Sequence, residues 1–233
     1  MAKAALDGAP ISGNDALAWA RWGAATGMLG VVAYLVGTGL IPPTARLEAG
    51  AIELARILAA MPGRLYFAAF MAIAGAILIV VLFVALTLLV PAGRPGSGLL
   101  RVSLATSIIA HTLVPVGGIV ALVAVNAAAS GMNPEFVLLC WRALWLSFVA
   151  SAVPTVLYTA TAVLGLARAG LAPGWISILG WIAAIAHAVA LFAVRERGLF
   201  ALDGLVGMLT PLTTDLWLLA LCVTLPGRVR RQV

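Results

Sequence analysis

The chain has 233 residues, of which 64% are hydrophobic and only 9% are charged, whereas an ordinary soluble domain is about 25% charged. This composition, with a mean hydropathy of +1.14, excludes a water-soluble globular domain and predicts an integral membrane protein in contact with a lipid bilayer. Fourteen basic residues exceed the eight acidic ones and give a net charge of +6. The basic residues stand singly or in small groups at the ends of apolar runs, which is typical of topology signals and not of a nucleic-acid-binding surface.

Six stretches are long enough to cross a bilayer, because a hydrocarbon core of ~30 Å needs about 20 apolar residues in a helix. We therefore expect an all-α fold, with a polytopic bundle of six transmembrane helices over residues 22–225. A polar N-terminal segment, 1–21, precedes the bundle, and a basic tail, 226–233, follows it. The expected spans are residues 22–40, 65–90, 102–127, 134–167, 175–194 and 205–225.

The first expected span carries Gly23, Gly27 and Gly30 on one helical face. Small residues at this spacing let a neighbouring helix approach closely, and we favour packing inside the bundle over dimerisation.

Residues 44–61 form an amphipathic segment. Their apolar side chains recur at spacings of three and four, whereas the charged Arg46, Glu53 and Arg56 fall away from that stripe, which consists of Leu47, Ala51, Leu54, Leu58 and Met61. We expect an interfacial helix, with a lid over the bundle as the alternative.

The fourth span has a clear start signal. Asn133 is a good N-cap, Pro134 suits the first helical position, and Glu135 places an acid in the first turn. We expect Pro154 to kink this long helix.

Six spans would place both termini on one side of the membrane. That side collects eight basic residues, and the opposite side six, which favours cytoplasmic termini in a bacterial inner membrane. The eight are Lys3, Arg21, Arg94, Arg101, Arg168, Arg228, Arg230 and Arg231; the six are Arg46, Arg56, Arg64, Arg142, Arg195 and Arg197.

Asp215 stands near the centre of the last span. A carboxylate at that depth costs ~2.5–3.5 kcal/mol on insertion scales, so it should face protein or water. At ~1.5 Å per residue, His111, Tyr158 and Asp215 all lie about 14–15 Å from the same side. We expect Asp215 to pair with His111 or Tyr158, either as a structural contact or as a proton or ligand site.

Two transmembrane histidines also raise the possibility of a haem, with His111 and His187 as axial ligands. We rank this below the Asp215 site and expect no cofactor. Two histidines and two cysteines do not make an ordinary zinc constellation, and the sequence has no catalytic motif such as GxSxG or HExxH.

Residues 163–180 run from the end of one span through a short turn into the next. The first span ends in a basic residue, Arg168, and the turn is followed by Pro173, the aromatic Trp175 and a Leu-Gly pair that ends at Gly180. This pattern, with the amphipathic connector at 44–61, resembles the DUF4386 family of bacterial six-helix membrane proteins. The resemblance implies a six-helix fold and no established activity, so it identifies no catalytic residue. Asp215 and His111 lie outside it.

For function, we expect a non-enzymatic scaffold or accessory subunit of a membrane assembly, whose partners are other membrane protein subunits. The alternative is a small proton-coupled transporter built on the layer of Asp215 and His111. An enzyme that acts on a lipid or a quinone, or a haem-dependent redox protein, comes third.

Overall fold

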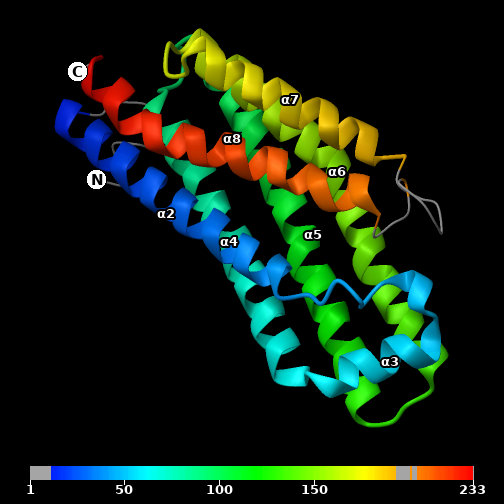
Figure 1. Cartoon of the computed structure of the whole chain (residues 1–233). Helices are drawn as coiled ribbons and strands as arrows, with labels where there is room; N and C mark the ends of the chain where they lie inside the picture. Colours follow the sequence, from blue (N-terminus) through cyan, green and yellow to red (C-terminus); the bar gives the residue numbers. More distant parts are fainter. Residues whose placement is uncertain (1–11, 193–199, 201–203, 233) are drawn as a thin grey trace.

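The structure is a computed structural model that describes residues 12–192, 200 and 204–232. Within these residues the chain is all-α, as predicted (Figure 1). Its helices are α2 (Gly13–Gly39), the 3-10 turn η1 (Leu47–Ala49), α3 (Ala51–Ala60), α4 (Pro62–Leu89), α5 (Ser97–Ala129), α6 (Pro134–Arg168), α7 (Gly174–Ala190) and α8 (Leu205–Arg230).

Five of these helices, α2, α4, α5, α6 and α8, are long and apolar enough to cross a membrane. Helix α7 is apolar but has only 17 residues, and at ~1.5 Å per residue it is about 25 Å long. It ends at Ala190, whereas we predicted a span to residue 194; residues 193 and 194 lie outside the described residues. By length and composition the chain is thus a multi-pass membrane protein with five helices that could cross the bilayer, and the sixth span stays a prediction.

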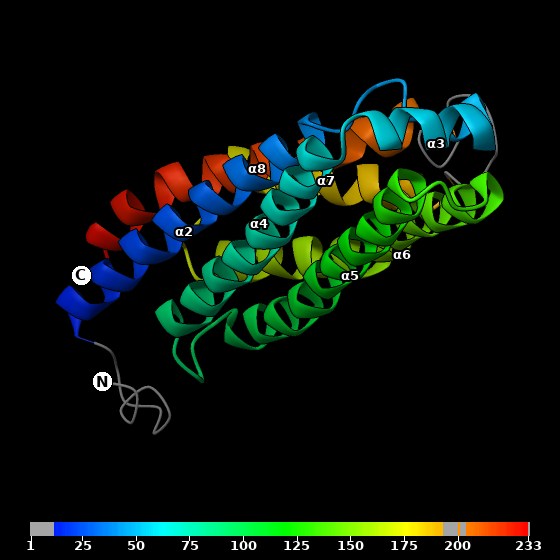
Figure 2. The same cartoon turned by 90° about the horizontal axis from the view of Figure 1, so that it is seen from below.

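The five long helices and α7 form a closed ring. Helix α2 packs on α4, α4 on α5, α5 on α6, α6 on α7, α7 on α8, and α8 returns to α2. The views in Figures 1 and 2 show α2 and α8 side by side, with the start of α2 and the end of α8 at the same end of the bundle. Helix α3 lies at the opposite end, where it packs on α5 and α6.

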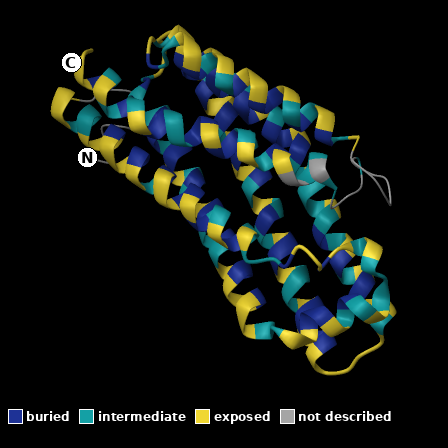
Figure 3. Cartoon of the chain, viewed as in Figure 1, coloured by how far each residue is buried: buried dark blue, intermediate teal, exposed yellow. Residues whose placement is uncertain are grey.

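The outer surface of the ring is apolar. Large hydrophobic side chains such as Phe70, Ile119 and Leu216 are each more than half exposed, and exposed positions alternate with buried ones along every helix (Figure 3). A soluble protein would cover such a surface with charge, so this surface is suited to contact with lipid.

Small residues hold α2 against α4. A Cβ atom added to Gly30 would lie 2.9 Å from the carbonyl oxygen of Gly75, and one added to Gly75 would lie 2.6 Å from the carbonyl oxygen of Gly30. Gly23 and Gly27 are equally close to Ala85 and Leu82 of α4. The prediction that the glycine face packs inside the bundle is confirmed.

The connector at 44–61 differs from the single helix that we predicted. Gly50 has φ +79° and separates the short turn η1 from α3, so the helix begins only at Ala51. Leu54 and Leu58 of the predicted stripe are fully buried, and Ile57 joins them. The indole Nε1 of Trp141 in α6 donates a 3.0 Å hydrogen bond to the carbonyl oxygen of Ala45. The connector therefore caps the ends of α5 and α6.

Two helix ends also differ from the prediction. Helix α2 begins nine residues before Trp22, because the Ser12 hydroxyl accepts a hydrogen bond from the Asp15 N–H and caps the helix. Helix α8 continues past Pro226 to Arg230, so the expected tail is mostly helical. The start of α6 is as predicted, since the Asn133 side chain accepts a hydrogen bond from the Glu135 N–H.

Candidate functional site

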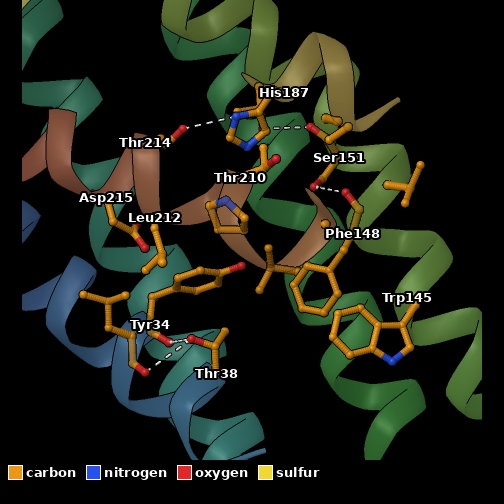
Figure 4. Close-up of a pocket in the computed structure, with 18 of the residues that line it drawn as sticks. Tyr34, Thr38, Trp145, Phe148, Ser151, His187, Thr210, Leu212, Thr214 and Asp215 are labelled. Carbon is orange, nitrogen blue, oxygen red and sulfur yellow. Dashed lines mark hydrogen bonds between the residues drawn. The ribbon is translucent and has the colours of Figure 1, made fainter. Parts of the chain in front are cut away.

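The ring of helices encloses a cavity of ≈ 410 Å³ (Figure 4). All six helices of the ring contribute to its wall, and so does the connector between α2 and η1. A volume of this size is within the range of small-molecule binding sites, ~300–1,000 Å³. The cavity is therefore the candidate site, and its chemistry follows from the side chains that line it.

Five ionisable or phenolic side chains from five different helices reach this cavity. They are Tyr34 of α2, His111 of α5, Tyr158 of α6, His187 of α7 and Asp215 of α8. The structure thus brings the three residues of the predicted layer to one cavity and adds His187 and Tyr34. Figure 4 shows Asp215 and Tyr34 in the same part of the cavity, on the neighbouring helices α8 and α2.

Among the described residues, Asp215 has no hydrogen-bond or ion-pair partner. Its side chain is 5% exposed, its Oδ2 atom is buried without a hydrogen bond, and no described residue forms an ion pair with it. The direct hydrogen bond that we predicted to His111 or Tyr158 is not formed. The two expected partners instead contact each other, with ring centroids 5.5 Å apart.

Both histidines are oriented by their own helices. His111 Nδ1 lies 2.8 Å from the carbonyl oxygen of Ser107, and His187 Nδ1 lies 3.0 Å from that of Ala183. A carbonyl oxygen can only accept a hydrogen bond, so each Nδ1 carries the proton. In the neutral ring, Nε2 is then an acceptor, which explains why neither histidine turns its N–H toward Asp215.

Four serine and threonine hydroxyl groups of the wall use their hydrogens on their own helices, whereas Thr214 Oγ1 lies 3.3 Å from His187 Nδ1. Thr155 donates to the carbonyl oxygen of Ser151 at 2.7 Å, and Thr210 donates to that of Val206 at 2.6 Å. Thr38 and Ser151 do the same within α2 and α6. These four side chains therefore offer the cavity oxygen lone pairs and no free donor.

The part of the cavity beside the α2–η1 connector is mostly apolar. Trp145 and Phe148 of α6 form an aromatic pair there, with ring centroids 5.8 Å apart. Arg46, the one basic residue among the described residues of the wall, is exposed, and its Nε donates to the carbonyl oxygen of Pro43. The cavity thus has a cationic side chain at its water-facing end and a carboxyl group deep inside.

Several wall residues were missed from the sequence, although a periodic pattern marks them. Gly207, Thr210, Thr214 and Leu218 recur at spacings of three and four, which puts them on one face of α8, and Asp215 lies at the edge of that face, next to Thr214. A helical wheel centred on Asp215 would have found this face. No such pattern marks Tyr34, because only the packing of α2 on α8 brings its side chain near Asp215.

The haem alternative stays a prediction. His111 and His187 line the same cavity, and each has a free Nε2. An absorption spectrum of the purified protein, with or without a Soret band, decides it.

Comparison of the chain with protein-family models, with curated proteins and with solved structures finds no match. The resemblance of residues 163–180 to the DUF4386 family therefore stays a prediction, and the cavity carries the functional reasoning.

Proposed function

We propose that this chain is a small proton-coupled transporter, with its substrate site in the central cavity and Asp215 as the group that exchanges the proton. One observation carries the proposal, namely a carboxyl group that is buried within a helix long and apolar enough to span a membrane and that has no hydrogen-bond partner among the described residues. A carboxylate at that depth costs ~2.5–3.5 kcal/mol on insertion scales, and no structural contact offsets this cost. A structural role would require the partner that Asp215 lacks.

The shape of the site supports the same function. A scaffold needs no internal cavity, whereas a transporter needs a site that is enclosed by its helices near the middle of the membrane. Three of these helices, α5, α6 and α8, carry an internal proline, at Pro115, Pro154 and Pro211. Proline removes one backbone hydrogen bond and allows the two halves of a helix to tilt, which transport requires.

The proposal includes the topology that the basic residues favour. Helix α7 is the sixth crossing, both termini are cytoplasmic, and the membrane is a bacterial inner membrane. Arg168, Arg228 and Arg230 support this, since they lie at the helix ends that share the side of the two termini.

The test uses proteoliposomes that contain the purified chain and a trapped pH dye. A pH gradient is imposed, and three probes of similar size are added in turn: benzyltrimethylammonium, benzenesulfonate and benzyl alcohol. We expect at least one probe to change the internal pH in wild-type vesicles and not in Asp215→Asn vesicles. Glu135→Gln is the matched control, because it makes the same chemical change at an exposed carboxylate at the start of α6. Equal traces from wild-type and Asp215→Asn vesicles with every probe would contradict the proposal.

A further inference from the structure

We propose that the substrate of this cavity is a monovalent organic cation with an aromatic or branched apolar body, bound in exchange for the proton of Asp215. This inference rests on the proposed function and specifies its substrate class.

The first support is charge. Asp215 is the acidic residue of the described cavity wall, and the single basic residue there, Arg46, is exposed at the end of the connector. Among the described residues Arg46 forms no ion pair with Asp215, and the charge of an exposed guanidinium is largely screened by water and salt. An ionised Asp215 therefore needs a positive charge that the protein does not supply.

The second support is the excess of hydrogen-bond acceptors. The two histidines present Nε2 lone pairs, and Thr38, Ser151, Thr155 and Thr210 present oxygen lone pairs, since their hydrogens are already donated. The phenol groups of Tyr34 and Tyr158 can donate or accept. A positively charged ligand, which oxygen and nitrogen lone pairs attract, fits this wall better than one that accepts hydrogen bonds.

Two prolines add backbone acceptors. Proline has no N–H, so the carbonyl group four residues earlier lacks its α-helical donor. Pro115 affects the carbonyl of His111, and Pro211 affects that of Gly207. His111 and Gly207 both line the cavity.

The third support is the aromatic wall. Tyr34, Tyr158, Trp145 and Phe148 line the cavity together, and the faces of such rings attract a cation within about 6 Å. The same rings, with apolar side chains such as Ile79 and Val114, can bury an apolar body. An inorganic cation would not use this apolar surface.

The exchange step is balanced in charge and atoms. In the empty cavity the carboxyl group of Asp215 holds a proton, because an unpaired buried charge is too costly. A cation R₄N⁺ enters, the O–H bond of the carboxyl group breaks, and the proton leaves to water while the carboxylate pairs with the cation. One positive charge replaces another, so the site is neutral in both states.

The test measures binding and proton release together. Benzyltrimethylammonium is titrated into the purified full chain in weakly buffered detergent solution, with calorimetry for affinity and a pH dye for protons. We expect release of about one proton per bound cation, and a loss in affinity of about tenfold or more in Asp215→Asn. Asp215→Glu should retain the proton release. Benzyl alcohol and benzenesulfonate should bind more weakly than the cation and release no proton.

Two results would overturn the substrate class: the cation binds no tighter than benzyl alcohol to the wild-type protein, or it binds without proton release. Both are measured on the wild-type chain, so neither depends on the folding of a variant. If benzenesulfonate or benzyl alcohol drives Asp215-dependent pH changes in vesicles while the cation does not, the transporter stands and the cation is wrong. If no probe does so, the transporter itself fails.

Discussion

Replacement of Asp215 by leucine should stabilise the ligand-free protein, although it removes the proposed coupling group. Leucine has nearly the shape of aspartate, with two methyl groups in place of the two oxygens. The carboxyl group has no hydrogen-bond partner, so the substitution leaves no buried group unsatisfied. On insertion scales the change from aspartate to leucine at a helix centre gains about 3–4 kcal/mol. Asp215 borders a cavity that can hold water, and we therefore expect about half of this gain, ~1–2 kcal/mol.

The assay is reversible unfolding in mixed micelles with increasing SDS, followed by tryptophan fluorescence. The chain has seven tryptophans, and Trp217 is fully buried only two residues from Asp215, which places a reporter close to the change. Thr210→Val is the matched control. It also makes a buried wall residue apolar, but the hydroxyl of Thr210 already has its acceptor, so a change within about 0.5 kcal/mol is expected.

A clear loss of stability in Asp215→Leu would refute this reasoning. It would show that the carboxyl group has a structural partner, as we predicted from the sequence for His111 or Tyr158. The same result would remove the observation on which the proposed function depends.

Three further substitutions test two packing contacts and one exposed ion pair. Trp141→Phe removes a buried hydrogen bond to the connector and should cost ~1–3 kcal/mol in the same assay, whereas Trp22→Phe, at a side chain that is 70% exposed, should cost nothing measurable. Gly30→Ala should destabilise the protein by about 1–3 kcal/mol, because its Cβ would lie 2.9 Å from a backbone oxygen of α4. Gly63→Ala is its control, because a Cβ there meets no atom within 4 Å. Equal stability of the two variants would contradict the close packing of α2 on α4. Arg56 on α3 donates two hydrogen bonds to the carboxylate of Glu53, and this pairing lowers the pKa of Glu53 below its ordinary value of 4.5. This contact stabilises the fold above pH 4.5 and is lost as the pH falls through the lowered pKa, so Glu53→Gln should flatten that part of a stability–pH curve.

The spans could be predicted from the sequence because the cost of exposing polar backbone to lipid depends only on local composition. The start of α6 followed from Asn133, Pro134 and Glu135, whose capping chemistry is also local. The connector was predicted as a single helix that is longer than the one in the structure, because nothing in its apolar stripe reveals that Gly50 adopts a positive φ.

The site was predictable only in part. Counting residues gave Asp215, His111 and Tyr158 a common depth, and the structure places all three on one cavity. Depth does not fix the rotation of a helix about its axis, however. The hydrogen bond from His111 to the carbonyl oxygen of Ser107 orients the imidazole ring, and the depth of a residue does not reveal such a bond. The expected contact with Asp215 therefore does not form. The part played by Tyr34 requires knowledge that α2 and α8 are neighbours.

The placement of both chain ends at one end of the bundle, away from the α3 cap, has a practical consequence. A fluorescent or enzymatic reporter should lie on the same side of the membrane whether it is fused before α2 or after α8. A reporter inserted in the exposed turn at Gly131, between α5 and α6, should give the other. Three fusions thus determine the sidedness of the whole molecule without disturbing a single residue of its interior.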